Sequence, residues 1–442
     1  MKEVPFDLIT HYCCEDVDYT LRLKHLFAQE LQKRHLTPIF TTIEMPLLPV
    51  LASMERHGMY VDTQELAKLS DYLNTHIHKL QTQIFQETGE TFNLNSPKQL
   101  GHILYEKMKL PPPTKKGIPP LSTSAEVLEE LQEKFPVCRN ILTYRGLEKL
   151  RSTYVETLPH EILPNTHRIH CTFNQSVAAT GRLSCQNPNL QNIPVRSEEG
   201  KKIRSAFKPS SPSWSFLAAD YSQIELRILA HLSQDEALMQ AFLQGGDIHR
   251  FTASLVFNVS QEEVSTEMRQ IAKAVNFGIL YGQQAFGLSQ QLGIPFQQAS
   301  TFITTYFERY PKIQSFLESC KEKARTTGLA TTFTGRQRPL LDIHSKNPSL
   351  KAAAERLAVN TPIQGAQADI IKLAMIEIHK KLTASPHLGF MVLQIHDELI
   401  FEVPDNALQE TSHLVKTIME NIMTLSVPLT VDIAIGKNWG EC

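Results

Sequence analysis

The chain of 442 residues has little that would place it in a membrane or outside the cell. No apolar run approaches the roughly 18 to 20 residues that cross a bilayer, and no charged-then-apolar leader opens the sequence. The seven cysteines are odd in number, scattered, and lack histidines at the spacing of a zinc site, so no disulfide framework is predicted. We expect a soluble cytoplasmic protein with reduced thiols and no membrane partner.

The sequence also lacks an excess of charge of one sign, and it contains no internal repeats or low-complexity segments. A formal net charge of -2 argues weakly against a dedicated binder of polyanions. Any phosphate contact would therefore depend on local clusters of cations. The candidates are Arg145, Lys149, Arg151, Arg196, Lys201, Lys202 and Arg204. For each lysine, ordinary solvated surface charge is the alternative.

One helical stripe combines cations with aromatics. Arg269, Lys273, Phe277 and Tyr281 are spaced four residues apart and would share one face of a helix. Cations bind phosphate oxygens, and aromatic planes stack on a sugar and base, so the stripe is suited to a nucleoside triphosphate. An amphipathic helix without any ligand produces the same spacing by chance. For the stripe alone, that alternative stays open.

Two acidic motifs lie on either side of this stripe in the sequence. An apolar run ends at Asp220, after which Ser222 is predicted to cap a helix. Further along, two short apolar strands are broken at His396, Asp397 and Glu398. An Asp in a turn usually serves local backbone hydrogen bonding, and this alternative is open for either Asp alone.

Together, these three segments resemble the polymerase motifs of the family A DNA polymerases, the bacterial DNA polymerase I group. Residues 172–196 resemble the primer-template segment of that family, and residues 355–365 its minor-groove segment. Shorter matches at residues 92–100, 149–154 and 436–440 extend the resemblance over nearly the whole chain. The resemblance implies an α+β right-hand polymerase, mostly helical, with a palm built on an antiparallel sheet and with helical fingers and thumb.

The resemblance also implies five parts. They are residues 1–35 as a remnant of the 3'-5' exonuclease domain, 36–170 as a palm-proximal helix and thumb, 171–233 as palm, 234–355 as fingers, and 356–442 as the rest of the palm. Tyr12 and Asp16 fit the last exonuclease motif, but the upstream Asp-x-Glu pair is missing from this sequence. We therefore expect no proofreading, and a remnant helix that packs on the polymerase. Prolines at 111–113 and 119–120 predict a loop.

The chemistry implied by the family is attack of a primer 3'-hydroxyl on the α-phosphorus of a deoxynucleoside triphosphate. Two divalent cations usually support such a displacement. By resemblance, Asp220 and Asp397 would hold two Mg²⁺ ions, with Mn²⁺ as a possible substitute. The resemblance makes the backbone carbonyl of Tyr221 a further ligand, and Mg²⁺ prefers oxygen ligands of this kind. Glu398 would be a supporting acid near the site.

A second group of residues would surround the incoming nucleotide. By resemblance its members are Gln223, Glu225, His249, Arg269, Lys273, Phe277 and Tyr281. Lys273 would also protonate the departing pyrophosphate. Glu225 would crowd the 2' position and reject ribonucleotides, the alternative being an ordinary helix acid that faces water. Tyr281 would occupy the place of the templating base until the fingers close, and Phe277 predicts discrimination against dideoxynucleotides.

A third group would contact primer-template DNA. Donors that face the minor groove check the geometry of a base pair without reading its sequence. The candidates are Asn174, Gln175, Arg182, Arg356, Asn360, Gln364, Gln394 and His396, with Lys149 and Arg151 on the backbone. For Asn174 and Gln175 a turn or cap role competes.

The predicted function is therefore template-directed DNA synthesis by a monomer in the bacterial cytoplasm, for repair, gap filling and replication. A metal-dependent nuclease is one alternative, but it would have no use for the cationic and aromatic stripe. A non-catalytic clamp on duplex DNA is another, but it would not need two acids at strand ends.

Overall fold

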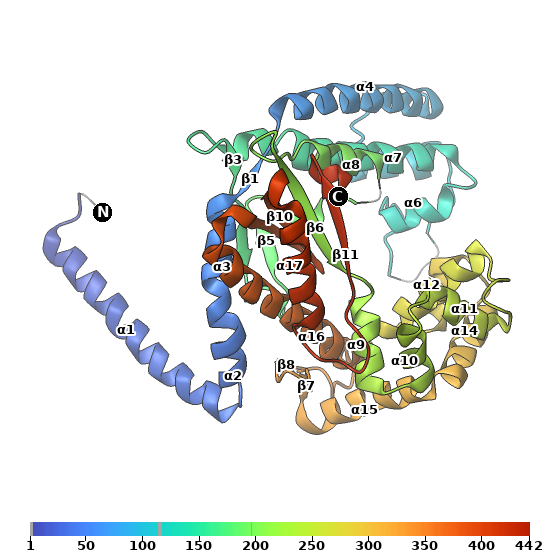
Figure 1. Cartoon of the computed structure of the whole chain (residues 1–442). Helices are drawn as coiled ribbons and strands as arrows, with labels where there is room; N and C mark the ends of the chain where they lie inside the picture. Colours follow the sequence, from blue (N-terminus) through green and yellow to red (C-terminus); the bar gives the residue numbers. More distant parts are fainter. Residues whose placement is uncertain (1–2, 114–116, 196) are drawn as a thin grey trace. The chain divides into compact units, whose positions relative to one another are not determined.

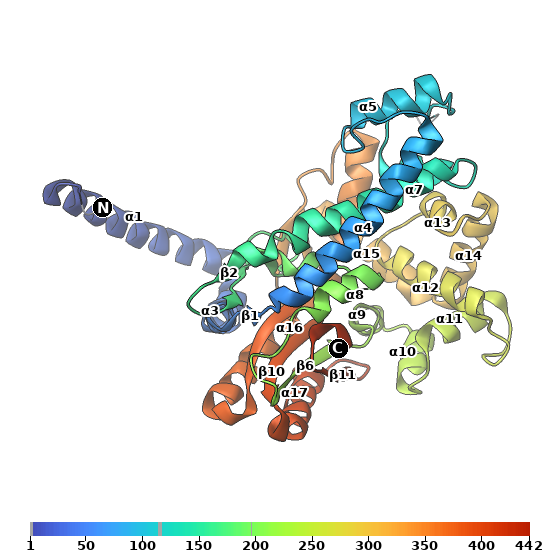
Figure 2. The same ribbon diagram turned by 90° about the horizontal axis from the view of Figure 1, so that it is seen from above.

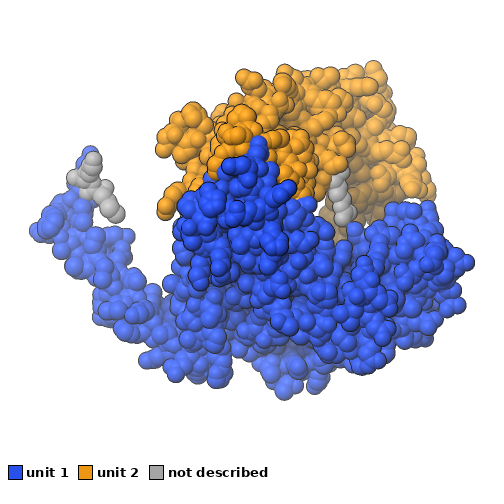
Figure 3. Space-filling view, in the orientation of Figure 1, with its two compact units in different colours: residues 1–54, 173–184, 218–433 blue, residues 55–172, 185–217, 434–442 orange. Residues whose placement is uncertain are grey.

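The computed structural model describes residues 3–113, 117–195 and 197–442. The chain divides into two compact units, shown in separate colours in Figure 3. Unit 1 comprises residues 1–54, 173–184 and 218–433, and unit 2 comprises residues 55–172, 185–217 and 434–442. These bounds differ from the five parts expected from the sequence, which stay a prediction. The candidate Arg196 lies outside the described residues.

A four-stranded sheet carries the strands on which the acidic motifs were predicted (Figure 1). Its order is β11-β6-β10-β9, with β6 (Trp214–Tyr221), β9 (Phe390–Ile395), β10 (Glu398–Pro404) and β11 (Val431–Gly436). β9 and β10 pair antiparallel, with Ile395 opposite Glu398, so His396 and Asp397 form the turn between them. The two apolar strands predicted on either side of this turn are confirmed.

The long helix α16 (Pro348–Ala384) packs against β9 and α9 (Ile224–Ser233). It begins with Pro348 after Asn347, whose side chain accepts a hydrogen bond from the backbone N–H of Ser349. A continuous series of its residues is buried, including Ile363, Ile370 and Met375. A helix that is apolar around most of its circumference belongs in a core. Helix α17 (Leu408–Asn421) packs on α16 and on β10.

Residues 234–355 are mostly helical, as predicted. The elements are α10 (Glu236–Leu243), α11 (Ile248–Phe257), α12 (Thr266–Leu280), α13 (Ala285–Leu292), α14 (Phe296–Arg309), α15 (Pro311–Thr327), and the strands β7 (Leu329–Thr331) and β8 (Gln337–Pro339). Side chains of Asp235, Asp247 and Ser265 accept backbone N–H groups at the starts of α10, α11 and α12. Helices α11 and α12 pack on each other, and this packing brings His249 of α11 close to Asn276 of α12.

Unit 2 is also largely helical. Its helices are α4 (Thr63–Thr88), α5 (Pro97–Gly101), α6 (Ala125–Leu131), α7 (Pro136–Leu150) and α8 (Glu198–Ser205), and its main sheet has β1 (Met59–Tyr60), β2 (Ile162–Leu163) and β3 (Arg168–Ile169). Helices α4 and α7 pack along each other (Figure 2). Residues 111–113 and 117–124 form neither helix nor strand, so the described part of the proline-rich segment is the predicted loop.

The N-terminal helix α1 (Phe6–Lys33) corrects one expectation. It forms a long helix, but none of its residues is buried, so it does not pack on the rest of the chain. Its apolar side chains are exposed, among them Phe6, Leu8 and Val17. Leu8, Tyr12, Tyr19, Leu23 and Leu26 are spaced three, four or seven residues apart, so they share one face of the helix, and all of them are exposed.

The helical stretch Thr37–His57 is long and apolar enough to cross a membrane by length and composition alone. The expectation that no run approaches this length is therefore corrected for this stretch, which runs from α2 (Thr37–Ile39) through η1 (Phe40–Glu44) into α3 (Met45–His57). The core helix of a soluble protein passes the same test. Leu47, Val50 and Met54 are indeed buried in the protein, as in such a core helix.

Candidate active site

The two predicted acids lie on segments that are distant in the sequence and adjacent in the fold. The backbone N–H of Tyr221, directly after Asp220 at the end of β6, donates to the carbonyl oxygen of Asp397 at 3.2 Å. Asp397 occupies the turn between β9 and β10, where His396 has a left-handed φ of +52°. The tyrosine ring is buried, and its hydroxyl donates to the carbonyl of Met419 at 2.8 Å, which anchors this strand end.

Negative charge accumulates at this junction. Burial and the neighbouring carboxylates of Asp397, Glu398 and Asp432 raise the pKa of Asp220 to about 8, although part of its side chain still reaches water. Burial also raises the pKa of Asp397 to about 6; Glu225 adds to this shift, whereas backbone hydrogen bonding opposes it. Each of these carboxylates disfavours the negative charge of its neighbours, and a divalent cation would relieve that repulsion.

The donor set fits a hard cation that keeps several ligands of its own. Among the residues that the structure describes, no group of three or more His, Cys, Asp or Glu is arranged to hold a metal ion. The oxygen ligands on offer at this junction are the carboxylates of Asp220 and Asp397 and the carbonyl of Tyr221. Mg²⁺ is commonly bound in this way, by one or two carboxylates together with water and substrate phosphates.

The raised pKa of Asp220 leads to a prediction about stability. Its carboxyl has an ordinary pKa of 3.8 and a pKa of about 8 in the folded chain. Between these values the folded chain binds a proton that the unfolded chain releases, so this group lowers stability progressively as the pH rises through that window. We expect Asp220→Asn to unfold at a higher temperature than the wild type at pH 8 in EDTA.

Thermal unfolding at several pH values checks this expectation. The advantage of Asp220→Asn should shrink from pH 8 to pH 5, because the wild-type carboxyl is protonated in the folded chain at the lower pH. Added Mg²⁺ should stabilise the wild type more than the variant, since a ligand stabilises the state that binds it. A wild type that is more stable than Asp220→Asn at pH 8 in EDTA would contradict the described charge cluster.

The start of α9 differs from the prediction at Ser222. Ser222 does not cap the helix; the N-cap is Gln223, in a left-handed conformation with φ +48° and without a capping hydrogen bond from its side chain. The hydroxyl of Ser222 instead donates to the carboxylate of Asp432 on β11. Arg227 donates to the Ser222 carbonyl at 2.8 Å. Tertiary contacts with β11 thus replace the expected local cap, and Asp432 is an acid near Asp220 that the sequence motifs did not indicate.

Glu225 does not face water. Its side chain is 8% exposed, so the alternative of an ordinary solvated helix acid is wrong. One carboxylate oxygen accepts from the guanidinium of Arg182 at 2.6 Å, and the other accepts from the hydroxyl of Tyr281 at 2.8 Å. Arg182 also donates to the side-chain oxygen of Gln367. Glu225 therefore links two other candidate residues, Arg182 and Tyr281, which come from separate segments of the chain.

The helical stripe is formed as its spacing predicts. Helix α12 carries Arg269, Lys273 and Phe277, and Tyr281 follows as the C-cap residue. The rings of Phe277 and Tyr281 lie 6.4 Å apart and nearly parallel, at 21°. Arg269 forms an ion pair with Asp247 at 2.6 Å. Among the described residues, Lys273 has no hydrogen-bond or ion-pair partner, so its ammonium group is available to a ligand.

His249 lies beside this stripe. The side chain is 4% exposed, and its ring centroid is 5.7 Å from that of Phe277. Burial lowers the pKa of His249 to about 4, with Lys273 and Arg269 adding to the shift and Asp247 opposing it. The imidazole is therefore neutral near pH 7.

The candidates for DNA contact fall into two classes. The side-chain nitrogen of Asn174, the Nε of Arg182 and the side-chain oxygen of Asn360 are buried without a hydrogen-bond partner. Buried polar atoms are rarely left unpaired, so these atoms are notable as possible ligand contacts. By contrast, Gln175 donates its amide to the Glu44 carboxylate at 2.6 Å, and Gln394 donates to the carbonyl of His396 at 2.7 Å. Arg356 is exposed and Gln364 is half-buried.

Three arginines proposed for phosphate contact are held by protein groups within unit 2. Arg151 pairs with two glutamates, at 2.7 and 2.6 Å. Arg145 donates to the carbonyl and hydroxyl of Thr123. Arg204 is buried, with its guanidinium 4.2 Å from the centroid of the Trp439 ring, so it is not a surface cation as expected. The exposed members of the predicted clusters are Lys149, Lys201 and Lys202.

A buried ion-pair network, which no motif indicated, lies next to Gln175 and Gly181. Glu44 of η1 accepts from Lys372 at 2.8 Å and also pairs with Arg336, which in turn pairs with Asp369. Burial opposes ionisation of Glu44, but the two cations lower its pKa. A Cβ atom at Gly181 would lie 2.6 Å from the Arg336 guanidinium, so only glycine allows this close approach.

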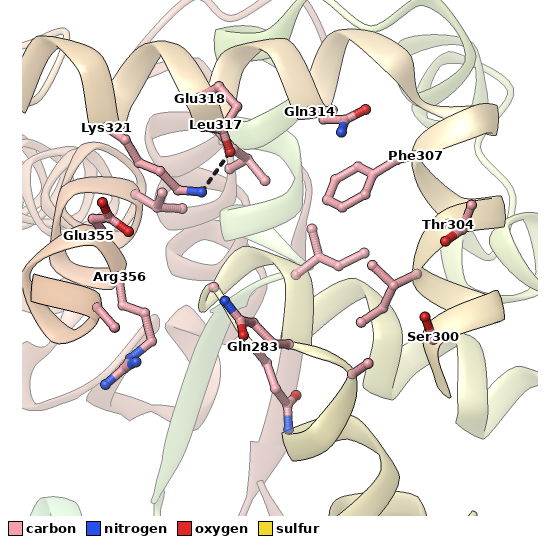
Figure 4. Close-up of a pocket in the computed structure, with 17 residues that line it drawn as sticks. Gln283, Ser300, Thr304, Phe307, Gln314, Leu317, Glu318, Lys321, Glu355 and Arg356 are labelled. Atoms are coloured by element: carbon pink, nitrogen blue, oxygen red, sulfur yellow. Dashed lines mark hydrogen bonds and ion pairs between the residues drawn. The ribbon is translucent and has the colours of Figure 1, made fainter. Parts of the chain in front are cut away.

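A cavity of about 270 Å³ lies next to Tyr281, between the α12–α13 junction and helices α14, α15 and α16 (Figure 4). Figure 4 shows Gln283 and Arg356 on one side of it and Phe307 and Gln314 on another. An ion pair between Lys321 and Glu318, at 2.7 Å, lines it as well. None of the clustered acids lines this cavity, so the candidate site lies outside it and is defined by its charge.

The structure thus combines acids at the ends of neighbouring strands with a helix that presents cations and aromatics. A family model described as DNA polymerase family A matches residues 63–441. The chain therefore belongs to the family A DNA polymerases, and its α+β right-hand fold is that of this family.

Curated relatives and a solved structure agree with this assignment. DNA polymerase I of Pseudomonas aeruginosa is 44% identical over 100% of this chain and 49% of its own length. DNA polymerase I of Bacillus subtilis is 46% identical over 94% of this chain and 47% of its own length. The POL domain of Pol1 from M. smegmatis, in complex with DNA primer-template and dNTP, has a TM-score of 0.91 and 38% identity, covering 96% of this chain and 74% of that one. The chain thus spans about half the length of these curated relatives.

Proposed function

We propose that this chain is a DNA-directed DNA polymerase that adds deoxynucleotides to a primer 3'-hydroxyl. The observation that carries the proposal is the junction of the Asp220 and Asp397 segments through the Tyr221 N–H, with the accumulation of negative charge there. The likeness to a polymerase domain solved with primer-template and dNTP supports those two partners. Repair and gap filling, action as a monomer and a cytoplasmic location belong to the same proposal.

The carboxylates of Asp220 and Asp397 would hold two Mg²⁺ ions, with the Tyr221 carbonyl as a further ligand and Glu398 as a supporting acid. When bound, such ions acidify the attacking hydroxyl and neutralise charge on the leaving group, and Mn²⁺ could take their place. The excess of negative charge described above supports this assignment, because it would be relieved by cations.

The stripe on α12 would bind the triphosphate. Arg269 and Lys273 would pair with its phosphate oxygens, and Lys273 would deliver a proton to the pyrophosphate as it leaves. Phe277 would stack on the sugar and base, while His249 would donate a hydrogen bond to a phosphate oxygen. Gln223, at the start of α9, would lie near the same nucleotide.

The primer-template would be held through its minor groove and backbone. Arg182, Asn174 and Asn360 bring unpaired buried polar atoms to this role, which supports their assignment. The further candidates are Gln175, Arg356, Gln364, Gln394 and His396 for the groove, and Lys149 and Arg151 for the backbone. The carboxamides of Gln175 and Gln394 would have to exchange a protein partner for DNA.

A primer-extension assay tests the proposed function. Purified protein is given each deoxynucleotide, with and without Mg²⁺, on primers with matched and with mismatched 3' ends. Templated, metal-dependent extension of the matched primer is expected, and no shortening of the mismatched one, because proofreading is not expected from this chain. Degradation without extension would favour a nuclease, and duplex binding without either reaction would favour a clamp.

Glu225 is proposed as the residue that rejects ribonucleotides. The Glu225→Ala variant removes a buried carboxylate and should open space at the sugar 2' position, raising ribonucleotide incorporation relative to deoxynucleotide by about 10-fold to 100-fold. The ratio of kcat/KM values for the two nucleotides measures this effect. Glu236→Ala, which removes an exposed acid from the first turn of α10, is the matched control. An unchanged ratio in Glu225→Ala would leave the carboxylate with a structural role only.

A further inference from the structure

A series of buried polar side chains, each close enough to the next for a hydrogen bond, ends at His249. The hydroxyls of Tyr310 and Thr252 lie 3.1 Å apart. The side-chain nitrogen of Asn276 lies 3.2 Å from the Thr252 hydroxyl and 3.1 Å from the Nδ1 of His249. Tyr310, Thr252 and Asn276 are fully buried, and His249 is 4% exposed. Water therefore has little access to these groups, so each must satisfy the others.

The carboxamide of Asn276 determines which group donates and which accepts at His249. A carboxamide nitrogen only donates hydrogen bonds, and it has two hydrogens. In Asn276 one hydrogen is directed at the Thr252 hydroxyl and the other at Nδ1 of His249. Nδ1 must then accept. A neutral imidazole with an accepting Nδ1 carries its proton on Nε2.

The charged groups around His249 keep the imidazole neutral. Lys273 and Arg269 face it from α12 and disfavour a positive charge on the ring, as burial does. Asp247 acts in the opposite direction, but its carboxylate is already occupied. It accepts the backbone N–H of His249 at 2.9 Å and pairs with Arg269 at 2.6 Å.

We propose that Asn276 is a positioning residue that holds His249 as the Nε2–H tautomer, so that the imidazole presents an uncharged donor to a phosphate oxygen of the nucleotide. The tautomer follows from contacts within unit 1 alone. Only its use in nucleotide binding rests on the proposed function. An uncharged imidazole keeps its Nε2–H across neutral pH, so the strength of this hydrogen bond does not change. An imidazolium would instead lose its positive charge as the pH rises through its pKa.

The tautomer can be measured without any activity. In ¹⁵N-histidine-labelled protein, long-range ¹H–¹⁵N spectra distinguish a protonated ring nitrogen from an unprotonated one. His249→Gln identifies the signal of His249 among the 17 histidines. We expect an unprotonated Nδ1 and a protonated Nε2 that do not change between pH 6 and pH 8. A wild-type spectrum with the proton on Nδ1, or on both nitrogens at pH 7, overturns the proposal.

Asn276→Asp reverses the contact, because a carboxylate can only accept. The variant should place a proton on Nδ1 of His249 and move the titration of the ring toward neutral pH. We expect the KM for nucleotides to rise about tenfold, with kcat changed by less than about threefold, since the interaction lost is one hydrogen bond to a charged group. The KM of the variant should also depend on pH between 6 and 8, whereas that of the wild type should not.

Two further variants separate positioning from packing. Asn276→Leu keeps the volume but donates nothing, and its KM should rise like that of Asn276→Asp without the added pH dependence. Val275→Ala creates a small cavity on the same buried stretch of α12 and should leave both tautomer and KM unchanged. If Val275→Ala raises KM as much as the Asn276 variants do, the effect is one of packing and the proposal fails. If the expected tautomer is found in a chain that does not polymerise, the proposed function fails and the tautomer assignment stands.

Discussion

Asp220→Asn is expected to lower the rate of primer extension in Mg²⁺ by at least about 10³-fold, the scale seen when a group that stabilises transition-state charge is removed. The substitution keeps the shape of the side chain and removes the charge that would hold a cation. Affinity for primer-template DNA should be kept, because phosphates are not attracted to a carboxylate. Single-turnover extension and fluorescence anisotropy on the same preparation measure the two quantities.

The control for this experiment is the loss of a charge elsewhere in unit 1. Glu410→Gln, on the exposed surface of α17, should leave extension unchanged. Asp397→Asn should reproduce the defect of Asp220→Asn, because the two acids lie on adjoining strand ends. Extension that survives both substitutions would remove these acids from the chemistry and would leave their clustering unexplained.

The second large effect is expected at Lys273. Lys273→Ala should lower kcat/KM for nucleotide addition by about 10²-fold to 10⁴-fold, since it removes both a phosphate contact and a general acid. Arg269→Ala should act mainly on KM, because Arg269 would bind phosphate without donating a proton in the reaction. Pre-steady-state kinetics over a range of nucleotide concentrations separates the maximal rate of addition from the affinity for the nucleotide.

Lys273→Arg is the sharper test of the proton-donating role. Arginine keeps the positive charge but is effectively never deprotonated in proteins. Nucleotide binding should therefore be largely retained while the maximal rate stays low. Lys351→Ala, an exposed lysine in the first turn of α16, should have no effect. A wild-type rate in Lys273→Arg would show that charge alone is needed at this position.

The elements that could be predicted from the sequence are those encoded in short stretches. The four-residue spacing of Arg269, Lys273 and Phe277 is a local property of one helix, and α12 has it. The apolar runs around Asp397 specify two strands and a turn for the same reason. The prolines at 111–113 break helical structure through their own geometry.

The features that escaped prediction depend on residues far away in the chain. Whether Ser222 caps α9 is decided by Asp432 on another strand, which takes its hydroxyl. Whether Arg204 is a surface cation is decided by Trp439, on which it is buried. The expectation that α1 packs on the polymerase came from the family, and in the structure none of the residues of this helix is buried.

The candidate site shows the same division. The positions of Asp220, Asp397 and the α12 stripe were indicated by motif, whereas their proximity was implied only by the family. The contacts of Glu225 with Arg182 and Tyr281, and those of Asn276 with His249, appear only in the folded chain. Neither residue type nor spacing distinguishes Asn276 from an ordinary polar residue on a helix.

Glu44 sets a boundary for how far the chain could be shortened from its N-terminus. None of the residues of α1 is buried, so the core of unit 1 contains no side chain from this helix. A cut beyond Glu44 would strand the ammonium group of Lys372, which is 1% exposed, without its carboxylate. An uncompensated buried charge costs about 3–5 kcal/mol, a large part of the stability of a typical domain. The core of unit 1 therefore depends on Glu44, whereas α1 contributes no buried residue to it.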